Sequence, residues 1–470
     1  MDEIAFLPAH AALAKIHAGE LSTRELIRAA LGQIEKLDST LHGFITVRAD
    51  EVLREAAEMD ERHARGERLP LHGLPLAVKD VIATAGIRTT FGVPDFMDNV
   101  PSADAGYVAK LKQAGALIIG KTSTPEFAAY VNTRNKIVGT TVNPWNLQLS
   151  SGGSSGGTAV AIATGMAALG IGTDFGGSIR FPAGLTGTVG LRGTPGLIPP
   201  YPSLWGWDMF AVPGPMCRTV ADTDLMLRVM SGPDRHSPLP PVPAYSGPEK
   251  SNAKKLRIAW SEDLHSLFPV EREVRRVMQE ARKTLVDVGF SISDAAPKLH
   301  GIEDSIVPLR SLRTLILHAS RLEETDKLSN RLLAHSIERA KATPALEVAK
   351  AEIARQKVWE RTATFFDDFD ILVIPASQMV GFDKEIAAPT KVDGVEFSEP
   401  LFSCMNTYAI TMLGWPCLVI PCGFAKTGEP IGLQIIAPLG HEARLMALGL
   451  LIEKETGWTN HIPPIARQAA

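Results

Sequence analysis

The stretch from Ser150 to Pro182 constrains the fold of this chain more than any other part of the sequence. Two glycine–serine clusters, at residues 152–157 and 176–178, flank an unbroken segment of small and apolar residues. Flexible linkers are polar throughout, so this segment is expected in a core, with the two clusters as ordered loops beside it. Glycine permits positive φ angles and the close approach of another group. The two loops can therefore hold serine hydroxyls and backbone N–H groups against one small ligand.

The same stretch resembles the signature sequence of the amidase signature family of serine hydrolases. The resemblance runs through residues 152–157 and then through Gly172-Thr173-Asp174, Gly176-Gly177-Ser178-Ile179-Arg180 and Pro182, and less closely through Gly187 and Val189-Gly190-Leu191. A weaker likeness extends from about Glu20 to Trp458, which is nearly the whole chain. Neither glycine–serine cluster alone would indicate the family, but together they indicate it strongly.

Members of this family use a Ser–cisSer–Lys catalytic set, and the resemblance implies these roles for Ser178, Ser154 and Lys79. Lys79 lies 75 residues before Ser154, which lies 24 residues before Ser178, and both spacings suit the family. Ser178 would attack the carbonyl carbon of the substrate and form an acyl-enzyme, while Ser154 would pass the proton to Lys79. The resemblance also implies a cis peptide bond between Gly153 and Ser154, and a hydrogen bond from Ser155 to the lysine.

Lys79 lies within an apolar strand that the sequence predicts from Leu74 to Ile82. A lysine can act as a base near neutral pH only if its pKa falls from about 10.4 toward roughly 7–8, and burial shifts it in that direction. The alternative is a lysine at a sheet edge whose amine reaches water. The distant serine clusters favour the catalytic interpretation.

An oxyanion formed in such a reaction needs several N–H donors that converge on it. We expect these donors in the backbone of one loop, which contains Phe175, Gly176, Gly177 and Ser178. Asp174 and Arg180 are expected to form an ion pair beneath this loop and to brace it.

A second interpretation comes from Gly152-x-Ser154-x-Gly156, which matches the nucleophile elbow of α/β-hydrolases. Ser154 would then be the nucleophile of a Ser-His-Asp esterase, with a histidine such as His441. An elbow follows directly from a strand, whereas the residues around 143–149 are typical of a loop. The sequence therefore favours the first interpretation.

A third interpretation is the glutaminyl subunit of a tRNA-dependent amidotransferase, which the resemblance also covers and which works in a multi-subunit assembly. That lineage usually carries Leu-Lys-Pro-Thr after the signature. This chain has Leu191-Arg192-Gly193-Thr194 instead, and the departure favours a free-standing amidase.

Residues 197–212 are rich in proline, glycine and aromatic residues, which is typical of a partly exposed loop that can wall a pocket. The candidate pocket residues are Tyr201, Trp205, Trp207 and Phe210. Such a pocket would suit anilides, aryl amides or aryl carbamates. Family members cleave amides, some esters and carbamates, so urethanase activity lies within the expected range.

Composition excludes several other classes of function. The formal net charge of −4 gives no electrostatic basis for binding nucleic acid or an anionic membrane. The four cysteines fit neither a zinc site nor a disulfide framework. We therefore expect no metal and no cofactor, a small-molecule substrate, and a monomer or homodimer. The sequence shows neither an apolar signal segment nor an uninterrupted apolar run of 18 residues, so we expect a cytoplasmic protein.

Strands and helices alternate along the chain, which predicts the α/β class. The resemblance implies one large domain, 1–470, with a central mixed β-sheet covered by helices on both faces. Within it we expect a helical segment at 1–66, a catalytic core at 67–230, a mainly helical region at 262–366, and core strands with a helix at 367–460. Buried strands are expected at 371–375, 417–421 and 431–436.

Overall fold

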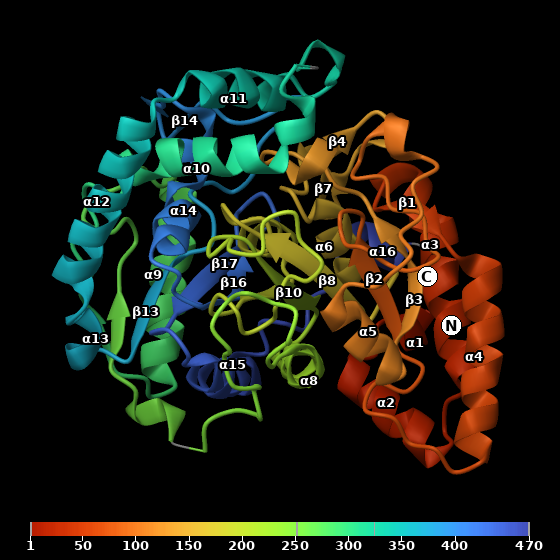
Figure 1. Ribbon diagram of the computed structural model, residues 1–470. Coiled ribbons are helices and arrows are strands. Elements are labelled where there is room, and N and C mark those ends of the chain that lie inside the picture. The colour runs from red at the N-terminus through yellow and green to blue at the C-terminus, as the bar shows by residue number, and fades with distance from the viewer. Residues whose placement is uncertain (1, 251, 324, 469–470) are drawn as a thin grey trace.

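The computed structural model describes residues 2–250, 252–323 and 325–468 (Figure 1). Within these ranges, eleven strands form one mixed sheet in the order β1-β3-β2-β8-β10-β9-β16-β17-β13-β11-β12. These strands are β1 (Phe44–Val47), β2 (Pro75–Lys79), β3 (Leu117–Thr122), β8 (Leu169–Asp174), β9 (Val189–Arg192), β10 (Val212–Cys217), β11 (Ile258–Trp260), β12 (Ile292–Asp294), β13 (Ile371–Pro375), β16 (Cys417–Phe424) and β17 (Pro430–Ile436). The mixed sheet and the α/β class predicted from the sequence are confirmed.

The other elements surround this sheet. The helices are α1 (Asp2–Ala5), α2 (Ala9–Ala18), α3 (Thr23–Leu41), α4 (Ala49–Ala64), α5 (Gly106–Gln113), α6 (Gly156–Ala163), α7 (Arg180–Thr186), α8 (Val220–Met230), α9 (Arg272–Asp287), α10 (Glu303–Leu317), α11 (Arg331–Ala342), α12 (Ala345–Thr362), α13 (Phe365–Asp368), α14 (Met405–Met412), α15 (Glu442–Thr456) and α16 (Pro464–Gln468). Short 3-10 turns are η1 (Pro94–Phe96), η2 (Glu126–Ala128), η3 (Ala253–Lys255), η4 (Ala319–Arg321), η5 (Thr325–Lys327) and η6 (Pro400–Cys404). Three two-stranded ribbons pair β4 (Arg134–Asn135) with β5 (Gly139–Thr140), β6 (Val142–Asn143) with β7 (Asn146–Ser150), and β14 (Lys391–Val392) with β15 (Val395–Glu396).

Strand β8 shows how helices cover both faces of the sheet. A Cβ atom at Gly170 would lie 2.6 Å from the side chain of Thr158, so this face of β8 is in close contact with α6. Leu169 and Ile171 point to the opposite face, because side chains alternate along a strand, and they share a hydrophobic cluster with Leu227 of α8. The expected helical cover on both faces is therefore present.

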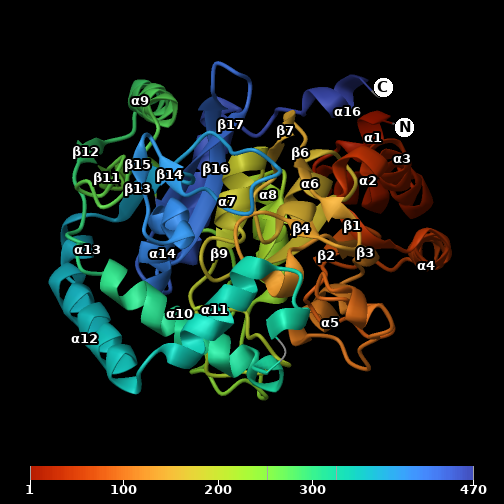
Figure 2. The same ribbon diagram turned by 90° about the horizontal axis from the view of Figure 1, so that it is seen from above.

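The two ends of the sheet carry different helices. Helices α1–α4 pack at the β1 end, and α12 lies at the other end with α10 and α11 beside it (Figures 1 and 2). The Ser22 hydroxyl accepts a hydrogen bond from the backbone of Glu25, whose carboxylate accepts from Ser22, so α3 begins with a capping box. None of the helices in the described part of the chain combines the length and the apolar composition needed to cross a membrane.

Candidate active site

Two parallel neighbouring strands bring the candidate catalytic residues to one edge of the sheet. β2 and β8 pair in parallel, so their carboxyl ends meet at the same edge. Lys79 is the last residue of β2, and Ser178 lies in the loop between β8 and α7. Ser154 lies just before α6, which packs on β8. Residues that are distant in sequence therefore meet in one place.

The amine of Lys79 is surrounded by hydroxyl groups. Its Nζ atom lies 2.6 Å from Ser154 Oγ, 2.9 Å from Ser155 Oγ and 3.0 Å from Thr173 Oγ1. The side chain is fully buried, and burial lowers the pKa of Lys79 to about 7, against a smaller opposing effect of the Asp174 charge. A substantial fraction of the amine is therefore neutral near pH 7 and able to accept a proton. The Ser155 contact was predicted from the sequence, whereas Thr173 was missed although it belongs to the signature stretch.

The peptide bond between Gly153 and Ser154 is cis, as the resemblance implied. A Cβ atom at Gly153 would lie 2.9 Å from the carbonyl carbon of Val131 and 3.0 Å from the carbonyl oxygen of Tyr130. Only glycine fits this close approach without displacing the neighbouring backbone. The requirement explains the glycine before Ser154 in physical terms.

The loop after β8 differs in one respect from the predicted oxyanion site. The N–H of Gly177 donates a hydrogen bond to Asp174 Oδ1, at 3.1 Å. In the described part of the chain, the N–H groups of Phe175, Gly176 and Ser178 have no acceptor. The predicted oxyanion site is therefore restricted to these three N–H donors, because the N–H of Gly177 is already bound to Asp174 and holds the loop in place.

Asp174 and Arg180 form the expected ion pair below this loop. Arg180 donates from Nε and Nη2 to the two carboxylate oxygens, at 3.0 and 2.8 Å, and both side chains are fully buried. Arg192, which the sequence analysis did not assign, lies 3.5 Å from the same carboxylate. Burial acts to raise the pKa of Asp174, but the two arginine charges and the hydrogen bond from Arg180 hold it well below its usual range. Arg192 is one of the two residues at which the chain departs from the amidotransferase pattern, and it is thus part of this buried charge cluster.

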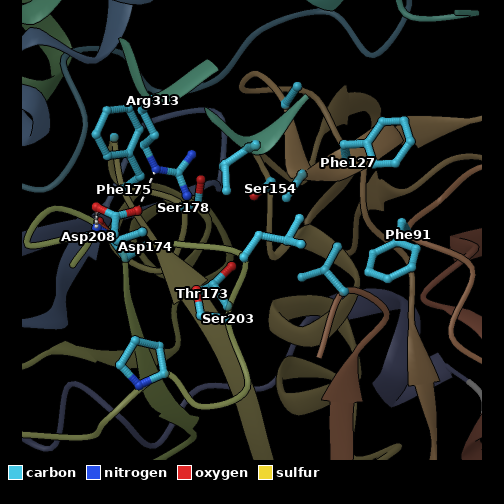
Figure 3. A pocket seen from close by; sticks show the side chains of 18 of the residues that line it. Phe91, Phe127, Ser154, Thr173, Asp174, Phe175, Ser178, Ser203, Asp208 and Arg313 are labelled. Atoms are coloured by element: carbon cyan, nitrogen blue, oxygen red, sulfur yellow. Dashed lines mark hydrogen bonds and ion pairs between the residues drawn. The ribbon is translucent and has the colours of Figure 1, made fainter. Parts of the chain in front are cut away.

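A cavity of about 610 Å³ opens above the two serines (Figure 3). Ser154 and Ser178 line it together with apolar and aromatic side chains. The aromatic residues of the lining are Phe91, Tyr107, Phe127, Tyr130, Phe175 and Tyr408. They come from loops, η2, α5 and α14, which are far apart in the sequence.

The aromatic residues predicted for the pocket do not line this cavity: Tyr201, Trp205, Trp207 and Phe210 are not among its lining residues. The side chain of Trp207 is 65% exposed, and Tyr201 stacks on His236 with ring centroids 4.9 Å apart. Phe210 is buried and lies edge-to-face with Phe175, with ring centroids 6.1 Å apart. The segment does border the cavity, but it does so through smaller residues: Pro200, Pro202, Ser203, Leu204, Asp208, Ala211 and Val212.

The esterase interpretation with His441 fails on the geometry. The residues before Ser154, expected as a loop, form the ribbon β6–β7, so a strand does precede the serine. Ser154 Oγ nevertheless contacts Lys79, and the His441 ring contacts the carbonyl oxygen of Leu439 instead. No cluster of three His, Cys, Asp or Glu side chains in the described ranges is placed to hold a metal ion.

Comparisons with known proteins match this geometry. The family profile described as Amidase matches residues 25–446. An acylamidase of Rhodococcus erythropolis is 34% identical over 96% of this chain and 95% of its own length. A glutamyl-tRNA(Gln) amidotransferase component of Thermosynechococcus vestitus is 32% identical over 95% of this chain and 97% of its own.

Solved structures share the fold over nearly the full length. A bacterial aryl acylamidase of the amidase signature enzymes superposes with a TM-score of 0.89, covers 100% of this chain and 99% of that chain, and is 24% identical. A structure from work on the evolutionary origins of an s-triazine catabolic enzyme has a TM-score of 0.85 at 27% identity, over 96% of this chain and 99% of that chain. The overall fold is thus shared across proteins of low sequence identity.

Proposed function

The chain belongs to the amidase signature family of hydrolases, and we propose that it hydrolyses small amides that carry an aromatic ring, with Ser178 as the nucleophile. The observation that carries this proposal is the cavity, which places an aromatic wall beside two serines and a buried lysine. We also propose that it acts on this small molecule as a monomer or homodimer, without a subunit of different sequence.

In the acylation step, the neutral amine of Lys79 accepts the proton of Ser154, which accepts the proton of Ser178. Ser178 Oγ then forms a bond to the carbonyl carbon of the substrate, and the carbonyl oxygen gains negative charge. The free N–H groups of the loop at 175–178 stabilise this charge. The C–N bond breaks as the leaving amine receives the proton from Lys79 through Ser154, and the acyl group remains on Ser178.

In the deacylation step, a water molecule replaces the amine. Its proton passes through Ser154 to Lys79 as its oxygen attacks the acyl carbon. Ser178 then leaves with that proton, and the carboxylic acid is released. The lysine alternates between its neutral and charged forms, and a pKa of about 7 suits both halves of the cycle.

The aromatic lining favours an aryl group on the substrate. Ligand cavities of roughly 300–1,000 Å³ with a mainly apolar lining enclose a drug-sized molecule, and aromatic pairs add attraction beyond the area that they bury. An aryl carbamate presents a similar ring and a C–N bond, so urethane cleavage is part of the proposal.

The second candidate function is glutamine hydrolysis in an amidotransferase assembly, because relatives of that description are about as similar as the acylamidase. Free glutamine carries two charges and a primary amide, so it has no group for the aromatic wall. If glutamine were hydrolysed as fast as acetanilide or faster, the result would favour this second function over the first.

Hydrolysis rates on a matched panel test the proposal. The panel contains acetanilide, a primary aliphatic amide, a phenyl carbamate and glutamine, each with wild type and with Ser178→Ala. We expect acetanilide to exceed the aliphatic amide in kcat/KM and Ser178→Ala to be inactive on all four. A fluorophosphonate should label Ser178 in a peptide map, and a label on Ser154 would contradict the assigned nucleophile.

A further inference from the structure

One face of α10 and the turn after it presents basic side chains to the cavity. The lining residues on this face are three or four positions apart, which is the spacing of one side of a helix. They are Arg310, Arg313, Thr314, Leu317, His318 and Arg321. This wall of the cavity therefore carries three guanidinium groups among mainly apolar lining residues.

The carboxylates that line the same cavity already have arginine partners. Asp174 is bound by Arg180, and Asp208 accepts a hydrogen bond from Arg313 Nε at 2.7 Å. Figure 3 shows Arg313 with Asp208 beside Phe175. Within the described residues, neither Arg310 nor Arg321 has an ion-pair partner, so the cavity keeps an excess of positive charge.

Arg310 is the most constrained of these groups. Its Nη1 atom donates to the hydroxyl of Tyr408 at 2.7 Å, and its guanidinium lies 4.7 Å from the centre of the Tyr130 ring. Its Nε atom is buried without a hydrogen-bond partner. Arginine stays protonated in proteins, and a charge removed from water is costly unless it is paired. The structure thus holds a cation in place without supplying its anion.

Its neighbours place Arg310 next to the chemistry. A Cβ atom at Gly176, in the loop before Ser178, would lie 2.3 Å from the Tyr408 ring, and the carbonyl of Tyr130 packs against Gly153, before Ser154. Arg310 therefore contacts both Tyr408, which packs on the Ser178 loop, and Tyr130, which packs on the Ser154 loop. An anion bound there would belong to a molecule that also reaches the two serines.

We propose that Arg310 binds a carboxylate on the amide substrate, so that the preferred substrates are aryl amides that carry one negative charge. The inference rests on the proposed function of the site. A carboxylate accepts hydrogen bonds from a guanidinium strongly and often in bidentate geometry, and it supplies the counter-ion that the cavity lacks. The same contact holds the scissile carbonyl at a fixed distance from Ser178.

The remaining titratable group on this wall is consistent with an anionic ligand. Burial, together with the charges of Arg321, Arg313 and Arg310, lowers the pKa of His318 to about 4. The imidazole is therefore neutral near pH 7, and the net charge that faces the cavity comes from the arginines. The aromatic wall can then take the ring while Arg310 takes the carboxylate.

Pairs of substrates that differ only in charge test this inference. One pair places the group on the ring, as 4-acetamidobenzoate and 4-acetamidoacetophenone, and the second places it on the acyl chain, as succinanilate and its methyl ketone analogue. We expect the carboxylate of one pair to exceed its ketone in kcat/KM by about 10- to 100-fold, which is the usual range for a hydrogen bond to a charged group. The pair that shows the preference tells which side of the scissile bond faces Arg310.

Variants assign the preference to a residue. Arg310→Gln should abolish the preference, mainly through a higher KM for the carboxylate, and should change the ketone rate much less. Arg310→Lys keeps the charge and should restore part of the preference. Arg321→Gln is the matched control, because it removes the same charge from the same wall and should leave most of the preference intact.

Binding to Ser178→Ala, measured by calorimetry, provides a readout that needs no turnover. A carboxylate that binds no more tightly than its ketone in both pairs overturns the inference. An equal loss of the carboxylate preference in Arg321→Gln and Arg310→Gln also overturns the inference. It would show that the preference comes from the overall positive charge of the wall and not from a contact with Arg310. Hydrolysis of acetanilide by wild type without any carboxylate preference would overturn this inference and leave the proposed amidase function standing.

Discussion

Lys79 Nζ and Ser154 Oγ lie 2.6 Å apart although 75 residues separate them in the chain. Both side chains are fully buried. A neutral amine has one lone pair, so it can accept only one of the three hydroxyl protons around it. Ser155 Oγ also lies 3.4 Å from the carbonyl oxygen of Thr173, which can accept a hydrogen bond from the Ser155 hydroxyl. The arrangement therefore favours Ser154 as the group that exchanges a proton with Lys79.

This relationship predicts the acid limb of the pH–rate profile. The neutral amine of Lys79 must be present in the free enzyme, so kcat/KM should rise as the pH climbs through about 7 and level off above it. Lys79→Ala should lower kcat/KM by about 10⁴-fold or more, since residues that act as a unit fail together. Lys79→Arg should be equally inactive because arginine stays protonated.

The control for this prediction is His441→Ala, which should keep wild-type activity and the same pH profile. Initial rates on acetanilide between pH 5 and pH 9 supply the measurement. If Lys79→Ala stayed active with an unchanged acid limb, the base would have to be another group and the mechanism would be wrong.

Thr173 provides a test of how finely the lysine pKa is set. Its hydroxyl lies 3.0 Å from Lys79 Nζ and stabilises the ammonium form by accepting a hydrogen bond. Thr173→Val should therefore shift the acid limb to lower pH and reduce kcat by roughly 2- to 10-fold, the usual range for one hydrogen bond. Thr188→Val makes the same chemical change at a buried threonine whose hydroxyl is hydrogen-bonded to that of Thr186. It should leave the acid limb of the pH–rate profile unchanged. A shift to higher pH in Thr173→Val would contradict this role.

The local pattern of the sequence was sufficient for the centre of the site but not for its walls. Lys79, Ser154 and Ser178 could be predicted to lie together because glycine clusters and an apolar strand mark them in short segments. The strands at 371–375, 417–421 and 431–436 were also found, since a strand buried on both faces is a continuous apolar run. These features depend on neighbours in the chain.

The cavity wall depends on contacts that no short segment contains. Phe127 and Tyr408 are 281 positions apart in the chain. Phe127 packs against the cluster that contains Leu333 and Ile337 of α11, and α10 contacts both α11 and α14, which carries Tyr408. The loop at 197–212 contains more aromatic residues than any segment that supplies an aromatic residue to the cavity. Its rings are placed elsewhere: Trp207 is exposed, Tyr201 stacks on His236, and Phe210 packs against Phe175. The composition of that loop therefore did not indicate which aromatic residues line this cavity.

Arg180→Ala should lower stability and activity together. The substitution leaves the Asp174 carboxylate fully buried without its bidentate partner, which costs about 3–5 kcal/mol when one member of a buried pair is removed. It also loosens the loop that Gly177 and Asp174 fix. We expect a clearly lower melting temperature and a lower rate on every substrate, with the same order of preference among them.

The matched control for this prediction is Arg257→Ala, which breaks an ion pair with Asp370 whose arginine is 51% exposed. Exposed ion pairs contribute little to stability because water screens them, so its melting temperature should change little. Thermal unfolding and rates on two substrates measure both variants. A change of substrate preference in Arg180→Ala at an unchanged melting temperature would show that Arg180 contacts the substrate.

The last prediction separates the observed aromatic wall from the one predicted from the sequence. Phe127 lines the cavity and stacks on Phe91, with ring centroids 6.3 Å apart. Phe127→Ala removes apolar contact from a bound aryl group, so KM for acetanilide should rise by about tenfold, which corresponds to about 1.4 kcal/mol of lost binding. KM for a small aliphatic amide should change much less, because it does not reach the ring. Trp207→Ala is the control of similar chemistry outside the cavity and should leave both values unchanged. Steady-state rates on the two substrates decide the matter: a larger effect in Trp207→Ala than in Phe127→Ala would mean that the loop at 197–212, and not Phe127, binds the aryl group.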